Sequence, residues 1–126
     1  MKKIIYSEKA PKPVGAYSQA VEVNGLLFCS GQISIDPATN EVITGDIQKQ
    51  TRQVMANIQA LLESQGLSMQ NIVKTGIFLT DMADFAKVNE IYSSYFPKEP
   101  PARSTVAVFA LPKGVNVEIE IIACRS

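Results

Sequence analysis

The strand-like run from Val115 to Cys124 constrains the fold more than any other segment of this chain. Five apolar side chains alternate along one side of it, which is the period-two pattern of a buried strand face. On the other side, Ile122 and Cys124 are joined by Glu118 and Glu120. A strand that is apolar on both sides needs cover on both faces of its sheet. The chain must therefore build a sheet that something shields on each face.

The rest of the sequence alternates strand-like and helix-like patterns. Asn24-Gly25 separates two apolar runs and is typical of a type I′ hairpin turn, because both positions accept positive φ. The most regular helical spacing follows Asp46, a suitable N-cap, and stops at Gly66, a suitable C-terminal residue. A second helix starts at Asp81 or Asp84 and ends at Pro97, and its buried stripe consists of Phe85, Val88, Tyr92, Tyr95 and Phe96. Strands are predicted over 4–7, 17–23 and 26–30 before the first helix, over 72–80 between the helices, and over 105–109 and 115–124 after the second helix.

This order, β-β-β-α-β-α-β-β, predicts an α+β domain with a mixed sheet of about six strands. Its two helices can cover only one face of that sheet. The face that remains is apolar in the last two strands, and an uncovered apolar face usually marks an interface. We therefore expect a homo-oligomer in which the uncovered sheet faces pack together, in preference to a monomer with an exposed apolar sheet.

Composition excludes several classes of protein. Twelve Lys and Arg residues balance twelve Asp and Glu residues, so the chain lacks the basic character of a dedicated nucleic-acid binder. Its 126 residues, 46% of them hydrophobic, predict one globular domain over 1–126. No apolar run approaches the ~20 residues of a membrane span. The N-terminus reaches Glu8 and Lys9 without the apolar core of a signal peptide, so a cytoplasmic protein is expected.

The residues that are missing limit the chemistry. There is no histidine, and the two cysteines, Cys29 and Cys124, are far apart in the sequence, so no ligand set for zinc and no imidazole base exists. Both cysteines lie in apolar runs and are expected to be buried thiols, with a disulfide as the alternative. No nucleotide-binding glycine motif is present. We expect no metal and no cofactor, and the chemistry must use carboxylates, arginine, hydroxyls, backbone groups and water.

Arg103 and Glu118 are the strongest candidates for a small site. Arg103 follows a rigid Pro100-Pro101-Ala102 entry to an apolar strand, and a guanidinium suits the bidentate binding of a carboxylate. Glu118 lies in a strand where partial burial raises a carboxyl pKa toward neutrality. The alternatives are a surface ion pair for Arg103, and for the glutamates a solvated sheet edge or a structural pair with Arg103. Spacing alone does not separate these interpretations.

Five short segments stand out along the chain. They are Gly15-Ala16-Tyr17-Ser18-Gln19-Ala20, Ser30-Gly31-Gln32, Val88-Asn89-Glu90-Ile91-Tyr92, Pro101-Ala102-Arg103-Ser104 and Val117-Glu118-Ile119-Glu120. Together they resemble the signature segments of the Rid (YjgF-type) family, the reactive-intermediate deaminases. They match in order across essentially the whole chain, without a large insertion.

The resemblance implies a chorismate-mutase-like α+β fold and a homotrimer with sites in clefts between adjacent subunits. It also implies hydrolysis of 2-aminoacrylate and related enamines or imines to 2-oxo acids and ammonia. On this interpretation Arg103 holds the substrate carboxylate and Glu118 positions or deprotonates the attacking water.

The same resemblance assigns the rest of the site. Tyr17, Gly31 and Asn89 line the pocket, and the backbone at Thr105 contacts the substrate nitrogen. The chain has Thr105 where members active on imines often have cysteine, and Ala107 where a glutamate is common. Two other functions therefore stay open. One is a regulatory module that binds a 2-oxo acid without turnover, and the other is an action on RNA, against which the balanced charge argues.

Overall fold

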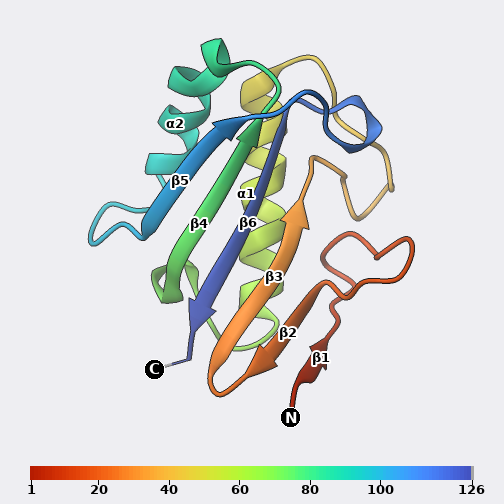
Figure 1. Ribbon diagram of the computed structural model, residues 1–126. Coiled ribbons are helices and arrows are strands. Elements are labelled where there is room, and N and C mark those ends of the chain that lie inside the picture. The colour runs from red at the N-terminus through yellow and green to blue at the C-terminus, as the bar shows by residue number, and fades with distance from the viewer. Residues whose placement is uncertain (126) are drawn as a thin grey trace.

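The computed structural model describes residues 1–125 and places the strands and helices in the predicted order (Figure 1). The hairpin turn is as expected, since Asn24 and Gly25 have φ of 51° and 78°. Three short 3₁₀ turns, Met69–Asn71, Met82–Asp84 and Pro112–Gly114, complete the connections. The main elements are β1 (Lys3–Ile5), β2 (Ala20–Val23), β3 (Leu26–Gln32), α1 (Ile47–Glu63), β4 (Ile72–Leu79), α2 (Phe85–Ser93), β5 (Ala102–Ala107) and β6 (Val117–Cys124).

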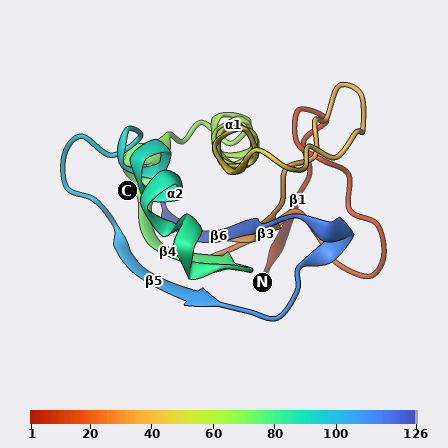
Figure 2. The same ribbon diagram turned by 90° about the horizontal axis from the view of Figure 1, so that it is seen from above.

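One six-stranded sheet has the order β1-β2-β3-β6-β4-β5, in which only β4 and β5 run parallel. Viewed from above, α1 and α2 lie on the same side of this sheet (Figure 2). The predicted α+β class, with a mixed six-stranded sheet and two helices on one face, is confirmed. β6 lies in the middle of the sheet, so the expectation that its glutamates occupy a solvated edge is wrong.

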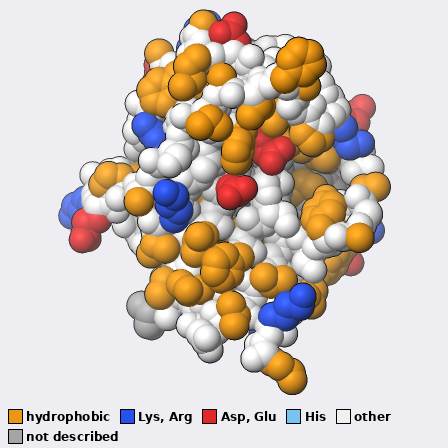
Figure 3. Space-filling view, viewed as in Figure 1, with side chains coloured by type: hydrophobic (Ala, Val, Ile, Leu, Met, Phe, Trp, Pro, Cys, Tyr) orange, Lys and Arg blue, Asp and Glu red, His pale blue; other side chains and the backbone are white. Residues whose placement is uncertain are grey.

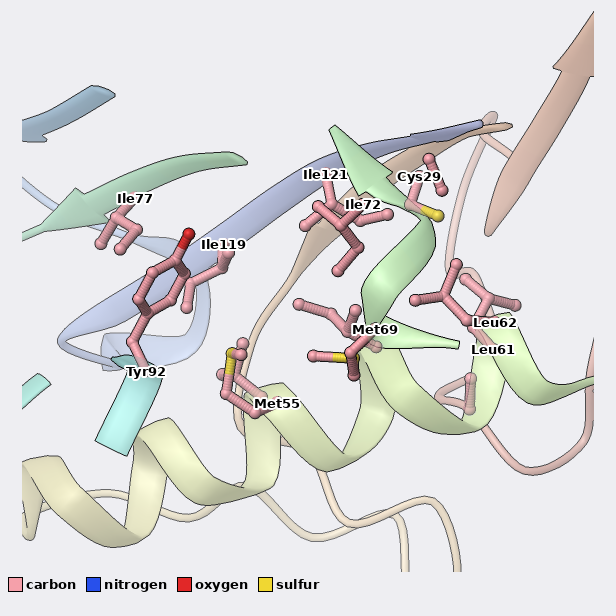
Figure 4. Close-up of a cluster of buried hydrophobic side chains, with 14 of the residues drawn as sticks. Cys29, Met55, Leu61, Leu62, Met69, Ile72, Ile77, Tyr92, Ile119 and Ile121 are labelled. Carbon is pink, nitrogen blue, oxygen red and sulfur yellow. The ribbon is translucent and has the colours of Figure 1, made fainter. Parts of the chain in front are cut away.

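The hydrophobic core fills the space between α1 and the sheet (Figure 4). Met55 and Leu61 of α1 belong to one buried cluster with Ile77 of β4 and with Ile119 and Ile121 of β6. The helix starts as predicted, because the side chain of Asp46 accepts hydrogen bonds from the backbone of the first turn. The odd-numbered side chains of β6 therefore point toward the helices, and the even-numbered ones point away.

The sheet face opposite the helices, here called the open face, carries large apolar side chains around two acidic groups (Figure 3). The strand pairing places Ile4, Val21, Phe28 and Ile122 in one row across it. Several of these side chains are exposed in the single chain: Ile4 at 55%, Phe28 at 39% and Val106 of β5 at 47%. An apolar face of this kind is typical of a surface that another subunit covers.

The strand that carries Arg103 is displaced from its predicted position. It was expected over 105–109, but β5 spans 102–107 because its parallel pairing with β4 ends where Ala107 meets Leu79. Beyond that point the chain leaves the sheet, and Phe109 is fully exposed. Arg103 therefore lies within the strand instead of at its entrance, and pairing with Thr75 of β4 aligns its backbone.

Two other element boundaries differ for local reasons. β2 starts at Ala20 and not at residue 17, because the buried side chain of Gln19 bonds the backbone of Ser7 and Pro11 and keeps the preceding segment in a loop. α2 ends at Ser93, well before Pro97, and hydrogen-bonded turns continue from there to Phe96.

Both cysteines are free thiols, as expected. Cys29 is buried on the helix side of the sheet, where burial raises its pKa to about 12, whereas Cys124 is only half-buried on the open face. Their side chains point to opposite faces, which explains why neighbouring strands do not join them by a disulfide. Across the described part of the chain, neither helix has the length and apolar character to cross a membrane.

Candidate active site

Arg103 extends from β5 onto helix α2. Its Nη1 donates a hydrogen bond of 2.7 Å to Oδ1 of Asn89. Its Cζ lies 5.2 Å from the ring centre of Phe85 and 5.0 Å from that of Tyr92, within the ~6 Å range of cation–π attraction. The structure thus brings together two predicted site residues, Arg103 and Asn89. It adds two aromatic rings that the sequence pattern had assigned only to the buried stripe of the helix.

Within the described part of the chain, no carboxylate forms a salt bridge with Arg103. Among residues 1–125, the one salt bridge joins Arg125 and Glu22 at 3.0 Å. The alternative in which Arg103 is paired with Glu118 for structural reasons is therefore wrong. Two rings and an amide hold the guanidinium in place without cancelling its charge, so its remaining N–H donors are available to an anionic ligand.

Glu118 lies on the open face, directly above Gly31. Gly31 lies in a β-bulge of β3 between Cys29 and Gln32, and the side chain of Glu118 on the neighbouring strand β6 reaches over it. A Cβ atom built on Gly31 would lie 2.2 Å from Oε2 of Glu118, closer than the Cβ atoms of real residues approach other heavy atoms. Any larger residue at this position would displace the Glu118 side chain, because the carboxylate occupies the space where a side chain would be.

A cavity of about 520 Å³ opens beside Glu118. Loops before β2, after β3 and before β6 supply its apolar walls, which include Val14, Ile33 and Pro112, and Tyr17 also lines it. The structure thus brings together the predicted residues Glu118, Gly31 and Tyr17. In the part of the chain that the structure describes, no group of three or more carboxylate or thiol side chains is placed to hold a metal ion.

Burial raises the pKa of the Glu118 carboxyl above its ordinary value, and the negative charge of Glu120 two residues away raises it further. Both causes act in the same direction, since each disfavours the charged carboxylate. A carboxyl whose pKa is shifted toward neutrality is better matched to exchanging a proton with water. This is the property that the proposed role of Glu118 needs.

The raised pKa of Glu118 predicts that Glu118→Gln stabilises the fold near neutral pH. The folded state binds the proton of Glu118 more tightly than the unfolded chain does. The resulting contribution to stability is present below the ordinary pKa of 4.5 and is lost as the pH rises through the raised value. We expect a higher Tm for Glu118→Gln than for the wild type at about pH 7, and no difference at about pH 4. Thermal unfolding with the exposed-site control Glu90→Gln checks this, and an equal or lower Tm at neutral pH would contradict it.

Arg103 and Glu118 lie on opposite faces of the sheet within one chain. Arg103 pairs in the ladder with Thr75, whose hydroxyl bonds Tyr92 on the helix side, whereas Glu118 faces away from the helices. The single chain therefore presents two half-sites: the arginine half-site (Arg103, Asn89 and the two rings) and the glutamate half-site (Glu118, Gly31 and Tyr17).

The two other predicted pocket residues differ in how firmly the structure holds them. Tyr17 is 53% exposed in a loop, and its hydroxyl accepts one long hydrogen bond of 3.4 Å from the backbone of Val14. Thr105 follows Arg103 on the edge strand β5, and its Oγ1 is buried without a hydrogen-bond partner. An edge strand also leaves part of its backbone unpaired, so the main chain near Thr105 retains groups that can bind a ligand.

Comparison with known proteins gives consistent matches over the whole chain. Residues 7–125 match the family model described as Endoribonuclease L-PSP. A RutC family protein of Pyrococcus horikoshii is 53% identical over 125 residues, which are 99% of each chain. The chloroplastic Reactive Intermediate Deaminase A of Arabidopsis thaliana is 45% identical over 122 residues, which are 97% of this chain and 65% of the plant protein.

Two solved structures share the fold closely. YyfA of Yersinia pestis, a Rid-family protein of unknown function, superposes with a TM-score of 0.96 at 50% identity, over 98% of this chain and 99% of its own. E. coli TdcF, solved with bound serine, superposes with a TM-score of 0.93 at 42% identity, over 98% and 99% of the two chains. With the family model covering nearly its full length and relatives at about half identity, this chain belongs to the Rid (YjgF) family.

Proposed function

We propose that this protein hydrolyses 2-aminoacrylate and related enamines or imines to 2-oxo acids and ammonia. The observation that carries the proposal is Arg103, a cation held in a fixed position with no acidic partner among the described residues. Such a group is suited to an anionic substrate. The deaminase name of the plant relative supports the same activity, although other relatives carry RutC or endoribonuclease names.

The proposed site forms between two subunits of a homotrimer. Within one chain, Arg103 and Glu118 lie on opposite faces of the sheet. They can therefore act on one substrate only if they come from neighbouring chains. Contact between the open face of one chain and the β5 edge of the next would be a heterologous contact, which closes into a ring. Such a ring would also cover the exposed apolar side chains of the open face.

The reaction needs only water and a proton relay. 2-Aminoacrylate first moves a proton from its nitrogen to its methylene carbon and becomes an imine. Arg103 of one chain binds the substrate carboxylate and presents the imine carbon to Glu118 of the neighbour. Glu118 takes a proton from a water molecule as the water oxygen bonds to the imine carbon, and it passes this proton to the imine nitrogen. In the tetrahedral intermediate the proton of the new hydroxyl group moves to the nitrogen, the C–N bond breaks, and ammonia leaves the 2-oxo acid. Holding a reactive substrate and one water in place is a sufficient source of acceleration for such a step.

A second candidate function is a regulatory module that binds a 2-oxo acid or amino acid without turnover. The specific observation in its favour is that TdcF, a close structural relative, was solved with serine bound. Thr105, in place of the cysteine common in the family's imine hydrolases, also fits this function. In such a module Arg103 would be needed and Glu118 would be dispensable. Action on RNA is not proposed, because positive and negative charges are equal in number.

The test is the rate at which 2-aminoacrylate, generated in place from serine by a dehydratase, becomes pyruvate. We expect the wild type to accelerate the reaction and Arg103→Ala to reduce kcat/KM about 100-fold while the oligomer persists. The variant also controls for contaminating activity. No acceleration by folded wild-type protein that still binds pyruvate would reject the deaminase and favour the binding module.

A further inference from the structure

Helix α2 presents three side chains to one guanidinium. Phe85, Asn89 and Tyr92 are spaced four and three residues apart, which places them on one face of the helix. All three contact Arg103: Asn89 through a hydrogen bond of 2.7 Å and the two rings through their faces, at 5.2 Å and 5.0 Å. One helical stripe thus encloses the cation from the core side.

One of these rings is itself fixed by a buried hydrogen bond. The hydroxyl of Tyr92 lies 2.8 Å from Oγ1 of Thr75, and both side chains are buried, with 4% and 1% of their surface exposed. Burial raises the pKa of Tyr92, so the hydroxyl stays protonated. Thr75 is also the ladder partner of Arg103 in the β4–β5 pair. The strand that aligns the backbone of Arg103 therefore also aligns the ring against which its side chain rests.

This arrangement orders a long side chain without neutralising it. An arginine loses rotamer freedom when it is fixed in one conformation, and a free surface arginine would lose it on binding each ligand. A carboxylate partner would fix the side chain but would also compete with an anionic ligand. Aromatic faces and an amide oxygen fix it while its charge remains available.

We propose that Phe85 and Tyr92 are positioning residues that hold Arg103 ready for the substrate carboxylate, with Thr75 fixing the Tyr92 ring. This role rests on the proposed function, because it assumes that Arg103 binds a carboxylate. It concerns affinity and not the proton relay, so the loss of a ring raises KM and leaves kcat nearly unchanged.

Two measurements on the intact oligomer test the role. The first follows the side-chain N–H signals of Arg103 by NMR without ligand, because ring faces shift these protons and slow the rotation of the guanidinium. The second is the Kd for pyruvate, a 2-oxo acid. Because the Tyr92 ring remains, we expect Phe85→Leu to reduce the ring-induced shift, to speed the rotation and to weaken pyruvate binding about fivefold. Phe85→Tyr, which keeps a ring, restores all three properties.

Tyr92→Phe isolates the hydroxyl. It keeps the ring and removes the bond to Thr75, so we expect faster guanidinium rotation and a smaller loss of pyruvate affinity, about twofold. Unchanged Arg103 signals and unchanged pyruvate affinity in folded Phe85→Leu would overturn the proposal. If pyruvate binds and responds as expected while imines are not hydrolysed, the positioning role stands and the deaminase activity fails.

Discussion

Mixing two inactive variants, Arg103→Ala and Glu118→Gln, restores imine hydrolysis. In one chain these residues lie on opposite sides of the sheet, so the proposed site takes Arg103 from one subunit and Glu118 from its neighbour. After unfolding and reassembly of an equal mixture, an interface is complete when a Glu118→Gln chain supplies the arginine and an Arg103→Ala chain supplies the glutamate. In a closed ring with random assembly this holds for about a quarter of the interfaces, and about a quarter of the wild-type activity is expected.

The control uses the same two changes in one chain. The double variant Arg103→Ala/Glu118→Gln, reassembled alone, has no complete interface and stays inactive. Native mass spectrometry of differently labelled subunits establishes that the chains have mixed. Mixed oligomers with no recovered activity would mean that one chain supplies both residues. That result would contradict the proposal that Arg103 and Glu118 of one site come from different subunits.

The sequence predicted the architecture well because the signals that determine it are local. The Asn24-Gly25 turn has positive φ at both residues, and Asp46 caps α1 through hydrogen bonds within a single turn. The alternation along β6 correctly divided its side chains between the two faces of the sheet. The uncovered apolar face also followed from a simple count, because two helices cannot cover both sides of six strands.

The errors lie where distant parts of the chain decide the outcome. β5 starts three residues and ends two residues earlier than predicted, because its register depends on parallel pairing with β4 and not on its own apolar pattern. The central position of β6 depends on the strand order, which no local pattern encodes. For the same reason the sequence could not place Arg103 and Glu118 on opposite faces, although each residue was identified singly as a candidate.

The arginine half-site could have been found more completely. Phe85, Asn89 and Tyr92 share one helical face. The two aromatic residues fit the pattern of a buried stripe, and that pattern by itself indicates no functional role for them. Their second role becomes visible only when pairing with β4 brings Arg103 against that face. Residues at the border of a core can serve packing and function together, and periodicity reports only the packing.

Gly31→Ala separates the fold from the function at the glutamate half-site. The new Cβ would lie 2.2 Å from Oε2 of Glu118 and 2.8 Å from its Cδ, so the carboxylate must move. The displaced atoms are the end of a flexible side chain, and Gly31 does not have a positive φ, so we expect the protein to fold and assemble. A displacement of about 1 Å at a catalytic group lowers kcat/KM roughly 100-fold, and that loss is expected here.

The matched control for this substitution is Gly76→Ala, on the same open face. Its Cβ would lie 3.3 Å from Cγ of Glu120, a contact that a shift of a few tenths of an ångström relieves. We expect Gly76→Ala to keep most of its activity in the 2-aminoacrylate assay, with both variants compared at equal oligomer content. Full activity in Gly31→Ala would show that the position of the Glu118 carboxylate does not limit the reaction, and Glu118 would then lose its role in activating water. Equal losses in the two variants would assign the effect to the packing of the open face, since Gly31 lies against Glu118 whereas Gly76 lies against Glu120.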